Sequence, residues 1–234
     1  MSPTYTNHRA RMAAAVGACA LLPACMTAKL DENRVAPMHI ASGERVVILA
    51  KPQVEGTGAE QDFMDCVGGK LAHGGDGLSV FGNEEFQNTM YPWFEPSVAP
   101  VHAENVAALL ERPKVSRRLE ETGVRYIVWL DGNTRKTDSG GSLACAAAPG
   151  MAGCFGFGWW EKQSDYQATV WDLKNAKSAG SVSTNVTGTS AILGLVVPLP
   201  FVARVQNTAC DRMAGQLRTF LKGGDPSVVD TGSH

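Results

Sequence analysis

The first half of the chain mixes buried-strand and amphipathic-helix patterns. Arg45 to Ala50 is a continuous apolar run, which is typical of a buried strand. From Ala59 to Leu71 apolar residues recur every four positions, and this spacing predicts a helix with one apolar face. A short strand at Leu78–Phe81 precedes a helix that begins at Asn83, whose first turn is acidic. Two further short helices are expected, at 103–111 and from Pro113 onward.

In the second half the hydrophobic period changes from four to two. Residues 124–131, 159–173 and 181–189 alternate apolar and polar side chains, which predicts three consecutive strands. A final set of apolar residues at helical spacing, from Val202 to Leu221, predicts a long amphipathic helix. Together the elements predict a single α+β domain, with a mixed sheet of about five strands and helices mainly on one face.

Three segments do not follow these patterns. Residues 25–44 are polar, and we expect an irregular tether before a domain that spans 45–222 and a flexible tail at 223–234. Residues 140–158 are rich in glycine and are expected to be irregular. Residues 191–201 carry no charge, so they are either a buried crossover beneath the last helix or an exposed contact site for protein or lipid.

The amino terminus has the parts of a secretory signal. In residues 1–24, two arginines precede a short apolar run that is too short to span a bilayer. The run ends in Leu22-Pro23-Ala24-Cys25, which resembles the lipobox of bacterial lipoproteins. This resemblance implies cleavage before Cys25, a lipid on that cysteine, and an outer-membrane anchor facing the periplasm, since Met26 is not the aspartate of inner-membrane retention. The alternative is an ordinary signal peptide in which Cys25 is incidental.

Composition narrows the classes of function. The formal net charge is −2 and no block of like charge stands out, which makes nucleic acid and anionic membrane surfaces unlikely partners for the folded part. No phosphate-binding loop and no zinc-ligand spacing is present, so we expect no cofactor and no metal.

The cysteines indicate an oxidising compartment. The chain has six, of which Cys19 leaves with the signal and Cys25 carries lipid, so four remain: Cys66, Cys145, Cys154 and Cys210. An even number favours two disulfides, and three pairings are open. A bridge between Cys145 and Cys154 is one hypothesis, because the short segment between them is rich in Ala and Gly and can turn back without strain.

Candidate chemistry is sparse. No GxSxG motif occurs. We expect His73 and His102 to have surface or capping roles, which are commoner for such residues. The alternative is that they form an acid–base or metal pair with Asp76 or Glu104. We assign no catalytic residue. Four aromatic residues enter the second strand, where they either pack in the core or form a partner-binding surface: Phe155, Phe157, Trp159 and Trp160.

Four segments carry a family resemblance: Val46–Leu49, Leu78–Met90, Gly123–Leu130 and Gln167–Gly180. Their order resembles the periplasmic α/β domain of the curli secretion-channel lipoproteins, of the lipoprotein activators of penicillin-binding proteins, and of the amino-terminal part of the Tol–Pal propeller protein. Such domains generally bind other proteins and catalyse nothing, and analogy of fold alone supports this expectation. In the resembling fold the first and last helices are neighbours, which implies a Cys66–Cys210 bridge. Two separate buried thiols are the alternative.

We therefore expect a lipid-anchored periplasmic protein that binds or scaffolds another envelope protein or assembly without catalysis. Its partners would be the membrane, through the lipid on Cys25, and an envelope protein. One alternative is a secreted cell-envelope hydrolase. Another is a ring-forming secretion component that assembles through residues 140–158, and the sequence leaves the oligomeric state open.

Overall fold

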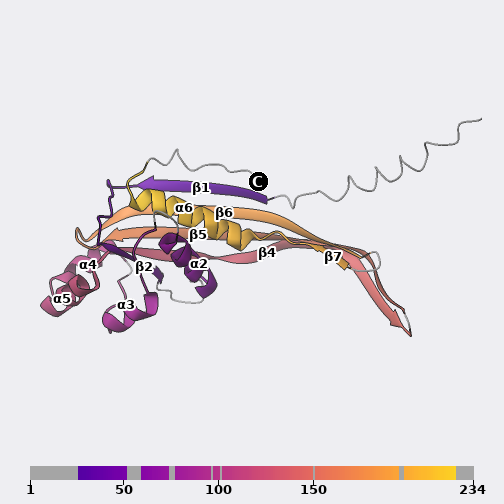
Figure 1. Ribbon diagram of the computed structural model, residues 1–234, viewed down its shortest axis with the longest axis horizontal. Helices are drawn as coiled ribbons and strands as arrows, with labels where there is room; N and C mark the ends of the chain where they lie inside the picture. The colour runs from indigo at the N-terminus through magenta and orange to yellow at the C-terminus, as the bar shows by residue number, and fades with distance from the viewer. Residues whose placement is uncertain are drawn as a thin grey trace, which may run out of the picture.

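A computed structural model describes residues 26–51, 59–73, 77–95, 97–100, 102–149, 151–194 and 198–224. One sheet runs in the order β1-β6-β5-β4-β2-β3, and β7 pairs with β6 (Figure 1). The strands are β1 (Met26–Arg34), β2 (Arg45–Ala50), β3 (Val80–Phe81), β4 (Val124–Ala148), β5 (Met151–Asp172), β6 (Lys177–Gly194) and β7 (Pro198–Phe201). The helices are α2 (Gln61–Ala72), α3 (Asn83–Thr89), α4 (Ala103–Leu110), α5 (Pro113–Thr122) and α6 (Val205–Leu221).

The α+β class and the mixed sheet are confirmed, because β2 runs parallel to β3 and β4 while the other pairs are antiparallel. The β4-β5-β6 meander is the expected run of three strands. The expected number of about five strands is wrong, since the described residues form a sheet of seven. The strands that we missed are short or polar edge strands, which lack the apolar alternation that marks a half-buried strand.

The helices cover both faces of the sheet, which corrects the expectation of one covered face. On one face, α2 and α6 bury Val46 and Ile48 of β2. On the other face, α3, α4 and α5 bury Val47 and Leu49 of the same strand. A continuous apolar strand is typically buried on both faces of its sheet, so the run at Arg45–Ala50 already indicated that both faces are covered.

The polar segment after Cys25 is a strand where we expected an irregular tether. All of β1 pairs with β6, from Met26 opposite Gly188 to Arg34 opposite Gly180. Its polarity misled the prediction because β1 is an edge strand. Leu30 packs against the core, and the residues on either side of it in the chain face away from that core.

The glycine-rich residues 140–158 are regular structure, which overturns another expectation. They belong to a long β4–β5 hairpin that stays paired out to Ala148 and Met151, and Figure 1 shows this hairpin bending away beyond β7. Gly141 has φ +99°, and a Cβ built there would lie 2.2 Å from the carbonyl oxygen of Phe157. Glycine is therefore required here by the close approach of two strands, and does not mark a loop.

The described part of residues 191–201 is not the buried crossover beneath the last helix. The described part belongs to the end of β6 and to β7, which turns back along the same sheet and pairs Ala191 with Phe201. The expected signal peptide at 1–24, Cys25, and residues 225–234 of the expected tail lie outside the described residues. Within the described part of the chain, no helix is long and apolar enough to cross a membrane.

Candidate functional site

The strand register divides the sheet into a charged part and an uncharged part. Asp138 of β4 lies opposite Glu161 of β5, and these are the last charged residues before the hairpin end. Beyond them, no described residue carries a charge. We call this region the uncharged sheet end, and it comprises residues 139–148, 151–160, 189–194 and 198–201.

One face of the uncharged sheet end is aromatic. Side chains alternate between faces along a strand, so Phe155, Phe157 and Trp159 share a face while Trp160 lies on the opposite one. The exposed fraction of the side chain is 77% for Phe155 and 45% for Phe157. The four aromatics that the sequence grouped together are therefore divided, and the two phenylalanines lie on the surface.

Sequence reasoning missed two members of this aromatic face. The register places Leu193 directly opposite Phe157. Phe201 lies opposite Ala191, and Ala191 in turn lies opposite Trp159, so Phe201 shares the same face. Both Leu193 and Phe201 are exposed. The signal in the sequence was the absence of charge in residues 191–201, although it did not reveal which strand these residues join.

A disulfide holds the hairpin end together. Cys145 and Cys154 lie directly opposite each other, with their Cα atoms 4.0 Å apart, and the bond between them is present. The hypothesis from the sequence is confirmed, although the bridge joins two paired strands and does not close an irregular loop. It holds Phe155 in register with Ala144 in the adjacent residue pair.

The outer edge of β4 extends well beyond the point where its partner strand β2 ends. β2 pairs with β4 only as far as Leu130, and no other described strand pairs with the remainder of this edge. From Arg135 to Ala147 every residue is exposed except Leu143, which is half-buried. Charged side chains and a β-bulge at 135–138 disfavour pairing of this edge with another strand. Residues 139–148 have neither charges nor a bulge.

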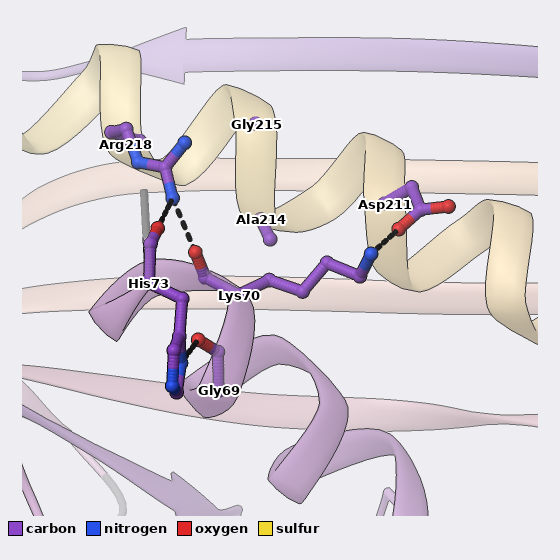
Figure 2. A pocket seen from close by; sticks show the side chains of 7 residues that line it. All are labelled: Gly69, Lys70, His73, Asp211, Ala214, Gly215 and Arg218. Atoms are coloured by element: carbon purple, nitrogen blue, oxygen red, sulfur yellow. Dashed lines mark hydrogen bonds and ion pairs between the residues drawn. The ribbon is translucent and has the colours of Figure 1, made fainter. Parts of the chain in front are cut away.

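A groove of about 470 Å³ lies between α2 and α6, on the face opposite the aromatic side chains (Figure 2). Lys70 reaches across it to Asp211, with Nζ and Oδ1 2.6 Å apart. Arg218 donates hydrogen bonds to the backbone carbonyls of Lys70 and His73 at the end of α2. These contacts join the two helices and satisfy carbonyls at a helix end, which is a structural role.

The Cys66–Cys210 bond is present in the same helix pair, with a Cα separation of 6.3 Å. The pairing implied by the family resemblance is therefore confirmed. Cys210 is fully buried beneath α2.

The candidate histidines belong to different elements. His73 follows α2, and its Nδ1 lies 2.6 Å from the carbonyl oxygen of Gly69. His102 precedes α4, and Asp76 lies outside the described residues. Within the described ranges, no group of three His, Cys, Asp or Glu residues is arranged to hold a metal ion.

A partly buried polar cluster joins the start of α2 to the central strands. The Tyr166 hydroxyl donates to the Glu60 carboxylate and lies 3.0 Å from Thr134 Oγ1. Burial raises the pKa of Tyr166, and the hydrogen bond to Glu60 raises it further. The ring of Tyr166 also stacks on Phe63, with ring centroids 3.5 Å apart, so the cluster positions α2 on the sheet.

The comparisons with known proteins are distant. No protein-family model and no curated protein matches this chain. A single-residue variant of the PelC dodecamer from Paraburkholderia phytofirmans has 12% sequence identity and a TM-score of 0.41, over 85% of this chain and 99% of that chain. The PelC dodecamer from the same organism in another crystal form has 11% identity and a TM-score of 0.34, over 85% and 98% of the two chains.

Proposed function

We propose that this chain is a lipid-anchored periplasmic protein that binds another envelope protein and has no catalytic activity of its own. The observation that carries the proposal is the unguarded edge of β4 at residues 139–148, which lies beside the exposed aromatic face. Proteins normally protect such edges with charge, proline or a covering element.

The chemistry of the edge suits the addition of a partner strand. An extended segment of a partner forms main-chain hydrogen bonds with a free strand edge, and side-chain pockets supply the specificity. Ala144 and Ala146 are small and exposed, so they leave the backbone accessible.

The envelope location is supported by two independent features. The lipobox-like residues before Cys25 imply export and acylation. The two disulfides are expected in an oxidising compartment and are rare in the cytosol. The resemblance to protein-binding envelope lipoproteins supports the same proposal.

Site-specific photocrosslinking in intact cells tests the partner. A photoreactive amino acid at Ala146 should give a defined adduct that mass spectrometry identifies as an envelope protein. The matched control is the same amino acid at Lys114, an exposed position on α5. The proposal fails if Ala146 gives no adduct, or if both positions give the same one.

A ring-forming component is a second candidate, and a specific observation favours it. β1 is the last strand on the opposite side of the same sheet, so one copy presents two edges that can pair head to tail. In that case the adduct at Ala146 would contain a second copy of this chain. Light scattering that finds a monomer at the concentration of the cell envelope would eliminate the ring.

A further inference from the structure

The start of β1 fixes where the anchor joins the fold. Met26 lies opposite Gly188, Gly188 lies opposite Lys162, and Lys162 lies opposite Lys136. The next row toward the hairpin end contains Glu161, and the row after that is uncharged. The chain therefore enters the sheet from Cys25 at the boundary between its charged and uncharged parts.

Met26, which follows Cys25 directly in the sequence, is already paired in the sheet. Consecutive Cα atoms are about 3.8 Å apart, so a lipid on Cys25 would join the chain next to this first paired residue. A lipid on Cys25 would place the membrane surface at this boundary. Figure 1 shows the tip of the β4–β5 hairpin at one end of the molecule and α3, α4 and α5 at the other, with β1 beginning between them.

The order of side chains along β5 follows the order of a membrane interface. Glu161 and Lys162 come first, then Trp159 and Trp160, and then the phenylalanines. Tryptophan is enriched where apolar and wet regions meet, because its ring has an apolar body and a polar N–H.

We propose that the uncharged sheet end rests in the headgroup layer of the membrane that carries the anchor, with its aromatic face toward the acyl chains. The inference relies on the proposed lipidation of Cys25 for its location, but the contact itself is made by protein side chains. The sheet end has open edges, and backbone groups need hydrogen-bond partners that hydrocarbon lacks. The hydrated headgroup layer supplies them, and it places the edge at 139–148 where a partner in the same membrane can reach it.

Vesicle binding without the lipid tests the contact. Protein with Cys25→Ser, exported and purified from the periplasm, is mixed with vesicles of phosphatidylethanolamine and phosphatidylglycerol that carry brominated acyl chains. We expect binding and bromine quenching of tryptophan fluorescence. Phe155→Ser/Phe157→Ser should weaken binding by about tenfold or more, because both rings lose their apolar contact with lipid.

The matched control lies at the helical end of the molecule. Tyr91 and Val98 are 61% and 60% exposed, so Tyr91→Ser/Val98→Ser removes comparable apolar surface and should leave vesicle binding unchanged. All four side chains are exposed, and unchanged thermal unfolding would confirm that both variants fold. Equal weakening by the two pairs, or no quenching in any variant, overturns the inference.

The inference and the proposed function can fail separately. Absence of acyl label on Cys25 would remove the anchor, while vesicle binding of the Cys25→Ser protein does not require it. If Phe155→Ser/Phe157→Ser abolishes the protein adduct at Ala146 but leaves vesicle binding intact, the aromatic face binds protein and the lipid contact is wrong.

Discussion

Replacing both Cys66 and Cys210 with alanine should lower the free energy of unfolding by about 5 kcal/mol. The bond closes a sequence separation of 144 residues, and the chain-entropy model gives this value for a loop of that size. The Cα separation of 6.3 Å lies within the usual range for disulfides, so the native state requires no displacement to form it. The same model gives about 2–3 kcal/mol for Cys145 and Cys154, whose separation is 9.

The location of each disulfide is expected to increase the difference between their effects on the free energy of unfolding. Cys66–Cys210 joins two helices that cover the same core, so its loss acts on global unfolding. Cys145–Cys154 lies at the hairpin end, outside both core clusters, and its loss acts mainly on local opening. For a chain of this size each kcal/mol shifts the melting temperature by about 2–4 °C, so Cys66→Ala/Cys210→Ala should melt about 10–20 °C lower.

Calorimetry of the two double variants, with and without reductant, measures the effect. Reductant should lower the melting temperature of the wild type strongly and that of Cys66→Ala/Cys210→Ala only slightly. The reasoning is refuted if Cys145→Ala/Cys154→Ala loses as much stability as the other pair. It is also refuted if the Cys66→Ala/Cys210→Ala variant remains as sensitive to reductant as the wild type.

Three further predictions concern single side chains. Cys25→Ser should abolish acyl labelling and release the protein from the membrane fraction, and continued labelling would contradict the lipobox interpretation. Tyr166 should make stability fall above about pH 10, because the unfolded tyrosine ionises there while burial keeps the folded pKa higher. Urea unfolding at about pH 8 and about pH 11 should show a smaller loss in Tyr166→Phe than in the wild type, and equal losses would exclude this linkage. Lys70→Ala should cost at most about 1 kcal/mol, because the pair with Asp211 is exposed to solvent. Arg218→Ala should also cost at most about 1 kcal/mol, because both of its hydrogen bonds to α2 carbonyls are exposed and water can replace the lost donor, and a much larger loss in urea unfolding would contradict this.

The elements with a strong local pattern were predictable from the sequence. Period-four spacing from Ala59 to Leu71 identified α2, and Pro113 marked the start of α5 correctly. Alternation at 124–131 and the run at 45–50 identified β4 and β2, because burial of one or both faces acts directly on neighbouring residues in the chain. The hypothesis of a Cys145–Cys154 bridge also rested on local information. Two residues so near each other in the sequence come together whenever the chain between them forms a tight turn.

Long-range pairing decided the rest. β1 has almost no apolar signal and is a strand only because the edge of β6 supplies its hydrogen bonds. The register of β5 and β6 brings Leu193 opposite Phe157, and a shift of one residue would have sent one of them to the other face. The free edge of β4 follows from where β2 ends, and the start of β1 at the charge boundary follows from where Met26 pairs. Such features depend on contacts between residues far apart in the chain, whose free energy no local pattern records, so only the tertiary structure determines them.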